Sequence, residues 1–209
     1  MQARLDLYMS TDHGDICPET AETLAMMREQ TERLSRMVRT LLDMSELKTV
    51  PRTDRIQIAP MIEEVLADLS PLAEKSGVTL AQSGGDLWIT GSDVLVYRAI
   101  FNLVENGVKY NCPGGSVCVA VSRRGQKAVI EVKDTGCGIP EDFRESVFQP
   151  FFRVDKSRSR EKGGVGLGLS LVWEIAHLHG GDVRVRESGE SGTAIELTLP
   201  ASEEERGMP

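Results

Sequence analysis

The sequence predicts an α/β (α+β) two-layer sandwich, in which helices cover one face of a mixed sheet, preceded by the remnant of a helical hairpin. Two observations lead to this fold class. Beyond residue 51, amphipathic helical patterns alternate with short runs of alternating apolar residues, and some of these runs pair into hairpins. Before residue 51 the chain carries one long heptad pattern. We therefore expect a partial helical domain at 1–50, an α/β domain at 51–202 and a disordered tail at 203–209.

Residues 18–48 are predicted to form a single long helix. Apolar or small residues recur there in alternating steps of three and four, as along a coiled-coil seam. The seam consists of Leu24, Met27, Thr31, Leu34, Val38, Leu41 and Ser45. An antiparallel helix pair cannot bury such a seam alone, so dimerisation into a four-helix bundle would complete it. An amphipathic helix that packs on its own domain explains the pattern equally well.

The remaining elements follow from periodicity and turn residues. Short strands are predicted near 55–58, 78–81 and 87–90, and hairpins pair 117–121 with 128–132 and 183–186 with 194–199. Amphipathic helices are predicted at 60–75, from Ser92 or Asp93 to about Tyr110, and through 169–176. His177 and His179 follow the last of these, where surface or helix C-terminal charge partners are expected.

Composition argues against several classes of protein. The net charge of −8 gives nucleic-acid binding no electrostatic support, and no apolar run approaches the ~20 residues of a membrane helix. The four cysteines form no CxxC pair and have no histidine at ligand spacing. A zinc site is therefore not expected, and a reduced, cytoplasmic location fits best.

A polar stripe runs along the predicted helix at 92–110. At about 100° per residue, Asn102, Asn106 and Lys109 lie within a sector of ~60°. Amide oxygens can hold a hydrated hard cation, and an ammonium can hold a phosphate. A solvent-exposed face with an ordinary Glu105–Lys109 ion pair explains the same stripe.

Two glycine-rich segments flank a basic one. In "DTGCGIP", a strand ends at Asp134, whose carboxylate could accept a hydrogen bond from an exocyclic amine of adenine, or could instead bond its own turn. "GGVGLGLS" lacks the Gly-Lys-Ser/Thr of a P-loop and follows no strand, so it is read as a flexible loop before a helix N-terminus that favours an anion. The segment between them is either a mobile lid over a polyphosphate or a solvated loop. Its basic residues are Arg153, Lys156, Arg158, Arg160 and Lys162.

In their order along the chain, these segments resemble the N, G1, F and G2 boxes of the ATP-binding catalytic domain of two-component sensor histidine kinases. The boxes read "NLVENGVKY", "DTGCGIP", "FQPFF" and "GVGLG". The resemblance covers roughly 55–200 and implies the Bergerat sandwich that gyrase-type and MutL-type ATPases share. Residues 18–48 are similar to the second helix of that family's dimerisation and histidine-phosphotransfer domain.

The resemblance implies that the chain binds ATP and Mg²⁺. Asn106 would be the Mg²⁺ ligand, Asn102 its supporting catalytic partner, and Asp134 the group that reads the adenine amine. The residues implied to contact phosphates or to border the nucleotide are Lys109, Arg153 and Tyr110. The remaining implied cofactor-binding residues, which line the glycine-rich loops and anchor the lid, are Gly136, Gly138, Ile139, Phe148, Phe151, Gly164, Gly166, Leu167 and Gly168.

The family also implies an activity and partners. A sensor histidine kinase transfers the γ-phosphoryl group of ATP to a histidine, from which a response regulator receiver domain takes it. Homodimerisation through residues 1–48 and a membrane-anchored parent protein are implied as well. The phosphoacceptor motif is missing, since His13 lies in "TDHGD" without a following Thr-Pro, and we expect that motif upstream of Met1. The fragment alone would then not autophosphorylate.

Two departures bear on the mechanism. Hydrolysing relatives carry a glutamate as general base where this chain has Asn102, so transfer to a protein nucleophile is favoured over hydrolysis. Gly107 replaces the usual alanine, at a helical cost of ~1 kcal/mol. An ATPase clamp of the MutL or gyrase type and a non-catalytic nucleotide-binding module remain as alternatives. An anti-sigma serine kinase ranks lower because it lacks the heptad helix.

Overall fold

The computed structural model describes two units of the chain, Met1–Ser45 and Glu46–Pro209. The residues described are 20–28, 30–31, 34–35, 38, 47–154 and 166–202. Those of the first unit are helical, and the seam positions Met27, Leu34 and Val38 are exposed. His13, most of the predicted lid, Gly164 and the tail at 203–209 lie outside the described residues. No helix in the described part of the chain is long and apolar enough to cross a membrane.

The second unit alternates helices and strands in the order that the sequence predicts. Its elements are η1 (Leu47–Thr49), β1 (Asp54–Gln57), α3 (Ile58–Ser76), β2 (Thr79–Gly84), β3 (Trp88–Gly91), α4 (Asp93–Lys109), β4 (Ser116–Arg124), β5 (Lys127–Asp134), η2 (Glu141–Phe143), η3 (Ser146–Phe148), α6 (Gly168–Leu178), β6 (Asp182–Gly189) and β7 (Gly192–Pro200).

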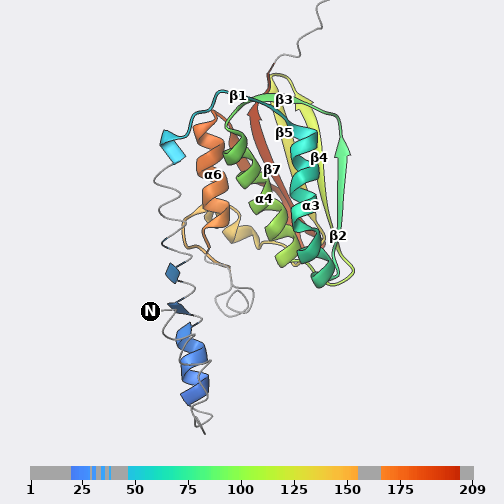
Figure 1. The fold of residues 1–209 in the computed structure, drawn as a ribbon. Coiled ribbons are helices and arrows are strands. Elements are labelled where there is room, and N and C mark those ends of the chain that lie inside the picture. The colour runs from blue at the N-terminus through green and yellow to red at the C-terminus, as the bar shows by residue number, and fades with distance from the viewer. Residues whose placement is uncertain are drawn as a thin grey trace, which may run out of the picture. The chain divides into compact units, whose positions relative to one another are not determined.

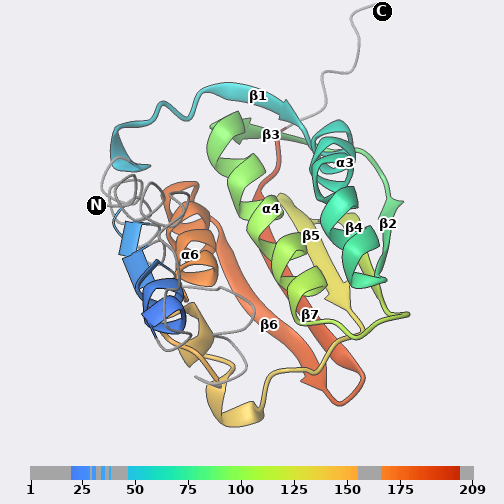
Figure 2. The same ribbon diagram turned by 60° about the horizontal axis from the view of Figure 1, so that its bottom comes forward.

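Five strands form one mixed sheet in the order β2-β4-β5-β7-β6. β2 runs parallel to β4, and the other neighbouring strands are antiparallel. Helices α3, α4 and α6 lie together against one face of this sheet, with α4 between the other two (Figures 1 and 2). The predicted two-layer α/β sandwich is therefore confirmed.

The core lies between the helices and the sheet. Because side chains alternate along a strand, Val117, Val119 and Val121 of β4 all point to the helical layer, where they are buried. On α4, Ile100 and Leu103 are also almost fully buried. The polar stripe predicted on α4 is thus left at the edge of this core.

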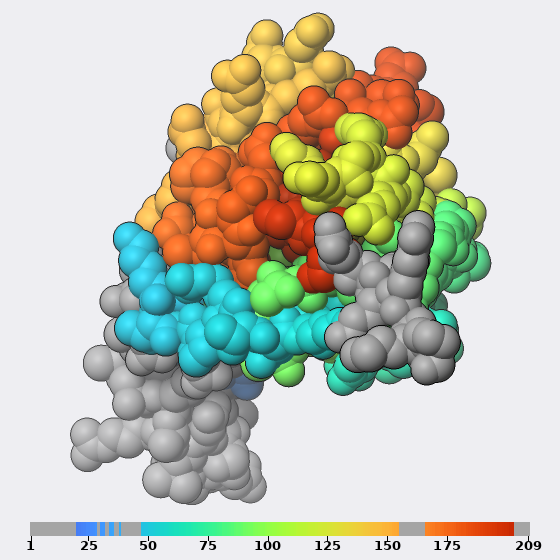
Figure 3. Space-filling model, turned by 90° about the horizontal axis from the view of Figure 1, so that it is seen from above, coloured from blue at the N-terminus to red at the C-terminus, as the bar shows by residue number. Residues whose placement is uncertain are grey.

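A separate two-stranded ribbon closes one end of the sandwich. β1 pairs with β3 in antiparallel register, and Ile89 of β3 forms an isolated bridge to Ala201 after the last strand. The Arg55 guanidinium lies 4.7 Å above the ring of Trp88 on the facing strand. Figure 3 looks onto this end and shows the cyan segment of η1 and β1 beside the orange surface of α6.

The two long helices begin and end at residues with clear local signals. α3 carries Pro60 in its first turn, where a missing N–H costs nothing. It stops at Gly77, whose φ of 65° gives a left-handed cap with its N–H directed at the carbonyls of Ala73 and Glu74. α4 begins after Ser92, whose hydroxyl accepts a hydrogen bond from the Leu95 N–H at 3.5 Å.

Candidate functional site

The asparagines of α4 face the first residue of α6. The Asn102 amide nitrogen donates to the Arg98 carbonyl at 2.7 Å, which fixes the side chain along the helix. A Cβ atom on Gly168 would lie 2.9 Å from Asn102 Oδ1 and 3.7 Å from Asn106 Nδ2. The two helices therefore approach closely at Gly168, which lies next to both amides at the N-terminus of α6.

Gly107 brings the same helix close to the sheet. A Cβ atom there would lie 3.1 Å from both methyl groups of Val117 and 3.5 Å from Cβ of Asp134. The usual alanine would be tight at this position, so packing explains the departure that the sequence shows. The contact also sets Asn106, the preceding residue, at the level of the strand end that carries Asp134.

Asp134 is a part-buried carboxylate at the end of β5. Its Oδ1 accepts hydrogen bonds from the N–H groups of Gly136 at 2.8 Å and Thr193 at 3.1 Å. Burial raises the pKa of this carboxyl, and the two backbone bonds offset only part of that rise. No residue in the described part of the chain hydrogen-bonds Oδ2, which leaves one oxygen available to a ligand.

The loop after Asp134 packs so closely on its neighbours that two of its positions, Gly136 and Gly138, have no room for a side chain. A Cβ atom on Gly136 would lie 2.3 Å from the Tyr110 carbonyl oxygen, which also accepts the Cys137 N–H at 3.2 Å. Gly138 has a φ of 71°, and its Cβ would lie 2.0 Å from the Gly189 carbonyl oxygen. The two glycines thus join this loop to the end of α4 on one side and to the β6–β7 hairpin on the other.

The β6–β7 hairpin contributes a support that the sequence did not predict. The Ser188 hydroxyl accepts the Ile139 N–H at 2.6 Å and lies 3.0 Å from the Thr193 hydroxyl. The Arg144 guanidinium donates to the Ser188 carbonyl at 2.6 Å. The sequence predicted only that 183–186 and 194–199 pair as a hairpin, not which loop that hairpin would contact.

The last turn of α4 carries a lysine that is already in an ion pair. Lys109 forms an ion pair with Glu105 at 2.7 Å, one turn earlier on the same helix. This is the i,i+4 pair that the sequence offers as an alternative to phosphate contact. Because both side chains are more than a quarter exposed, the pair is screened and can exchange for a stronger anion. Tyr110 follows as the C-cap and is half-buried.

The aromatic segment after η3 is joined to the second glycine-rich loop. The Phe151 N–H donates to the Gly166 carbonyl at 2.8 Å, and Phe151 itself has a φ of 64°, a strained value for a bulky residue. Its ring is half exposed, whereas the ring of Phe152 packs on Phe143 with centroids 5.6 Å apart. Phe152 therefore provides the inward aromatic contact of this segment.

Other residues implied by the resemblance lie around this junction. Phe148 is half-buried at the end of η3, and Arg153 is half-buried near Gly166, whose Cβ would lie 3.2 Å from the arginine Cγ. Leu167 is 2% exposed and precedes α6, and its carbonyl accepts the Ser170 hydroxyl at 2.9 Å. These contacts bring the two loop boxes together at the start of α6.

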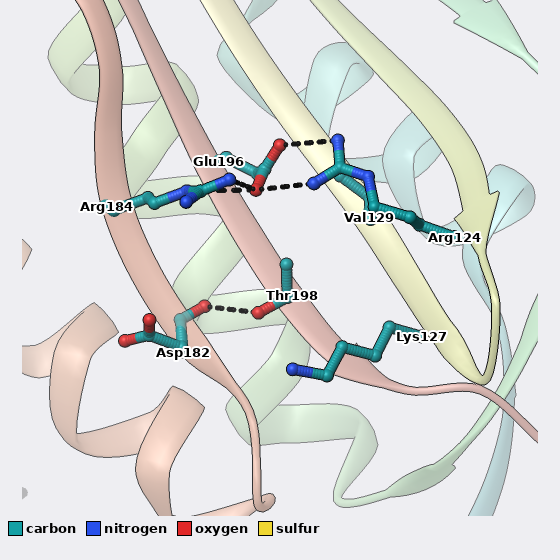
Figure 4. A pocket seen from close by; sticks show the side chains of 7 residues that line it. All are labelled: Arg124, Lys127, Val129, Asp182, Arg184, Glu196 and Thr198. Atoms are coloured by element: carbon teal, nitrogen blue, oxygen red, sulfur yellow. Dashed lines mark hydrogen bonds and ion pairs between the residues drawn. The ribbon is translucent and has the colours of Figure 1, made fainter.

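The opposite face of the sheet carries a second buried carboxylate. Glu196 of β7 is 1% exposed and accepts hydrogen bonds from Arg124 at 3.0 and 3.2 Å and from Arg184 at 2.7 and 3.1 Å. Figure 4 shows both guanidinium groups converging on it in a shallow pocket. Burial raises the pKa of Glu196, but the arginine hydrogen bonds outweigh burial and hold the pKa below its ordinary value. Both carboxylate oxygens are occupied by the protein's own groups.

Together, these features define a class of fold: a mixed five-stranded sheet with helices on one face and a polar helix, a strand-end carboxylate and glycine-rich loops at one edge, which is the Bergerat sandwich. Residues 91–203 match the family described as histidine kinase-, DNA gyrase B-, and HSP90-like ATPase. The chain belongs to this family.

Individual relatives narrow the comparison to sensor histidine kinases. The sensor-like histidine kinase SenX3 of Mycolicibacterium smegmatis is 32% identical over 198 residues, which cover 93% of this chain and 51% of the relative. The sensor histidine kinase RppB of a Synechocystis species is 30% identical over 188 residues, which cover 88% and 41%. The chain thus spans about half the length of the curated relatives it matches.

Solved structures agree with this assignment. The mycobacterial sensor histidine kinase MprB superposes with a TM-score of 0.63 at 28% identity, covering 71% of this chain and 97% of that one. The histidine kinase ThkA in complex with the response regulator protein TrrA has a TM-score of 0.70 at 22% identity, covering 98% and 58%. The second likeness shows the fold alone.

Proposed function

We propose that this chain is the ATP-binding catalytic region, with part of the dimerisation region, of a sensor histidine kinase that transfers the γ-phosphoryl group of ATP to a histidine. The observation that carries the proposal is the convergence of three elements. The end of β5 supplies Asp134, α4 supplies Asn106, and the N-terminus of α6 comes within van der Waals distance of the α4 amides at Gly168.

In this proposal Asp134 recognises the adenine. Its Oδ1 is held by two backbone N–H groups, so the carboxylate cannot rotate away, and Oδ2 accepts the hydrogen bond from the exocyclic amine. Gly136 and Gly138 let the loop pack closely on the Tyr110 and Gly189 carbonyls beside Asp134. The triphosphate then extends along α4 toward Gly168, where the first N–H groups of α6 and its dipole favour negative charge.

The residues present fit a magnesium ion that is shared with the nucleotide. Mg²⁺ usually keeps several waters and takes few protein ligands beside substrate phosphates, and a single amide oxygen is such a ligand. No group of three or more His, Cys, Asp or Glu able to hold a metal is found among the described residues. Asn106 would hold the ion, which neutralises phosphate charge during transfer. Lys109 and Arg153 would contact the phosphates.

The proposed reaction is transfer to a protein nucleophile. Asn102 would stand where hydrolysing relatives carry a general base, and a carboxamide does not take up a proton at neutral pH; its nitrogen donates to the Arg98 carbonyl. The attacking imidazole in this proposal is that of a phosphoacceptor histidine on a dimerisation-domain segment. Gly166 and Phe151, joined by a backbone hydrogen bond, would support the loop that covers the nucleotide.

The proposed partners follow from the same assignment. ThkA was solved with a response regulator, and we extend that class of partner, a receiver domain, to this chain. The exposed seam positions Met27, Leu34 and Val38 support homodimerisation through residues 1–48, because a coiled-coil seam is stable only when a second surface covers it. The cytoplasmic location and the membrane-anchored parent stay predictions.

Titration of ATP into the chain, with Mg²⁺ and with a chelator, tests the nucleotide site. We expect Mg²⁺-dependent binding that Asn106→Asp abolishes, because the new carboxylate would place a negative charge against the phosphates. Glu196→Gln, on the other face of the sheet, is the control and should bind as the wild type does. Tight Mg²⁺-dependent binding by Asn106→Asp would refute the metal assignment.

Labelled ATP separates the proposed kinase from the alternatives. With a dimerisation-domain fragment that carries the phosphoacceptor histidine, we expect acid-labile, alkali-stable label on the fragment and little free phosphate. Steady phosphate release without the fragment would instead support an ATPase clamp. Binding without either product would support a nucleotide-binding interaction module.

A further inference from the structure

His179, directly after α6, has backbone partners on both ring nitrogens. Nε2 accepts the Ser92 N–H at 3.0 Å, and Nδ1 lies 2.8 Å from the Ile175 carbonyl oxygen, to which it can only donate. Both bonds form together only in the neutral tautomer that carries its proton on Nδ1. A protonated ring would place an N–H at Nε2 against the N–H of Ser92, and that bond would be lost.

The ring fits into space that a glycine leaves open. A Cβ atom on Gly91 would lie 2.6 Å from Cδ2 and 2.9 Å from Nε2 of His179, so any larger residue at 91 would displace the imidazole. The ring is half-buried in this position. Burial lowers the pKa of His179 and the nearby Arg52 lowers it further, while the bond to Ile175 acts in the opposite sense.

Among the described residues, the charged groups near this junction bond the backbone, and Arg52 donates to the Val50 carbonyl at 3.2 Å. The Asp54 carboxylate accepts the Asp93 N–H at 3.2 Å, and the Asp93 carboxylate accepts the Val94 N–H at 2.6 Å. His177, two residues before His179, stacks on Trp173 with centroids 3.9 Å apart and places Nδ1 at the Trp173 carbonyl. His179 is thus the titratable group that connects α6 to the start of α4.

This connection lies at one end of a helix pair whose other end carries the nucleotide site. Ser92 is the N-cap of α4, and His179 is the C-cap of α6. At the opposite end of α6, Gly168 packs on Asn102, which lies in the middle of α4 one turn before Asn106. The two helices lie side by side over the sheet in Figures 1 and 2. The two helices are therefore joined at both ends of α6, once by a glycine contact to the middle of α4 and once by an imidazole at the N-cap of α4.

We propose that His179 is a positioning residue: in its neutral form it joins α6 to the N-cap residue of α4, keeps the spacing of the helices that bear Gly168 and Asn106, and so makes nucleotide binding sensitive to acid. This step rests on the proposed function, because it assigns His179 a role in building that nucleotide site. His179 touches no substrate; it acts through the placement of the two helices.

The ring itself is tested first, on the intact chain without nucleotide. Nitrogen-15 NMR of the histidine rings over pH 5–8 should show His179 with its proton on Nδ1 and a pKa below 6.5, the ordinary value for histidine. A ring that titrates at or above 6.5, or one that populates both tautomers, overturns the proposal. His177, exposed on the same helix, is the internal reference.

Three variants then separate positioning from packing. His179→Gln keeps an acceptor near the place of Nε2 but does not titrate, His179→Phe keeps a ring but no acceptor, and His177→Gln is the control. His179→Phe should lower the thermal midpoint by about 2–6 °C, since the Ser92 N–H loses its partner. His179→Gln should stay close to the wild type at pH 7.5, as should His177→Gln.

Nucleotide affinity gives the deciding comparison. One pH unit below the pKa that NMR gives for His179, about nine-tenths of the rings are protonated, and the dissociation constant of the wild type should rise by up to about tenfold. In His179→Gln, the dissociation constant should not show this acid-dependent rise from His179. Protonation of Asp134 would weaken binding equally in both proteins. An identical acid loss in His179→Gln, or full affinity in His179→Phe, overturns the positioning role. If the wild type binds no nucleotide at any pH, the proposed function fails while the NMR result for the ring still stands.

Discussion

Asp134 and Glu196 are two carboxylates on neighbouring strands of one sheet, both withdrawn from solvent, yet they are built differently. Asp134 is held through one oxygen by backbone N–H groups, and its other oxygen has no partner among the described residues. Glu196 has both oxygens paired with Arg124 and Arg184. The pKa of the first is raised and that of the second is lowered. The protein thus pairs both oxygens of Glu196 with its own groups and leaves Oδ2 of Asp134 for the ligand that we propose.

The two pKa shifts link stability to pH with opposite signs. A raised folded-state pKa means that Asp134 favours folding most at pH below its ordinary value of 3.8, and this contribution is lost as the pH rises through its folded pKa. A lowered pKa means that Glu196 stabilises the fold above its ordinary value of 4.5, and this contribution is lost as the pH falls through its folded pKa. At neutral pH, the buried charge of Asp134 therefore lowers the free energy of unfolding, and a ligand that bonds this carboxylate can offset the loss.

The largest expected effect is the loss of nucleotide affinity in Asp134→Asn. The amide can still accept the two backbone N–H groups, but its other end presents donors to the adenine amine. We expect affinity for adenine nucleotides to fall by about 100-fold, the value of a hydrogen bond to a charged group. Calorimetric titration measures it, and Glu196→Gln is the matched carboxylate-to-amide control. Equal losses in both variants would end the distinction between the two carboxylates.

The next effect concerns the loop that orients Asp134. Gly138→Ala would place its Cβ 2.0 Å from the Gly189 carbonyl oxygen, whereas Gly125→Ala, in the β4–β5 turn, has a φ of 63° and no neighbour within 4 Å. Both variants carry the strain of a left-handed residue, about 1–2 kcal/mol, but only the first must also move its neighbour. Urea unfolding should show the larger loss for Gly138→Ala, and only that variant should weaken nucleotide binding. Equal losses of unfolding free energy in the two variants would mean that the loop around Gly138 can move to accept a side chain.

Glu196→Gln should produce a smaller, purely structural effect. Removing the carboxylate leaves Arg124 and Arg184 facing each other, but both are more than half exposed and are screened by solvent. We expect a loss of about 1–2 kcal/mol in the free energy of unfolding and no change in nucleotide affinity. Weakened binding in this variant would show that the outer face communicates with the nucleotide site.

The smallest expected effect is a shift of the thermal midpoint at neutral pH, which should differ in sign between the two variants. Asp134→Asn removes a buried charge and should raise the thermal midpoint slightly at pH 7, where Glu196→Gln lowers it. Scans toward acid pH should bring Asp134→Asn closer to the wild type as the pH falls through the raised pKa of Asp134, and Glu196→Gln closer only as the pH falls below 4.5 toward the lowered pKa of Glu196. Shifts in the same direction for both variants would contradict the opposite pKa directions.

Local patterns in the sequence anticipated much of this molecule. Helix periodicity predicted α4 and its polar stripe, and alternation predicted both hairpins, because these signals arise between residues close in the chain. The hydrogen bond from Thr193 to Asp134 spans 59 positions, and that from Ile139 to Ser188 spans 49. Such bonds depend on which strands become neighbours, and neither periodicity nor turn chemistry encodes that.

The residues around the site show the same division. Glycines signalled a close approach, but the sequence could not say that Gly136 meets the Tyr110 carbonyl or that Gly91 meets the ring of His179. Phe151 and Phe152 are adjacent and chemically alike, so the inward ring could not be chosen before the left-handed backbone at Phe151 was seen. The sequence thus predicted the kinds of group at the site, and the fold determined their partners.

A crystal structure of this chain with Mg²⁺ and a non-hydrolysable ATP analogue is the most direct test of the account. We predict that the adenine amine will hydrogen-bond Oδ2 of Asp134, with Mg²⁺ on the Asn106 amide oxygen and the phosphates toward Gly168. A nucleotide bound elsewhere, or one that reaches only one of these two residues, would contradict it.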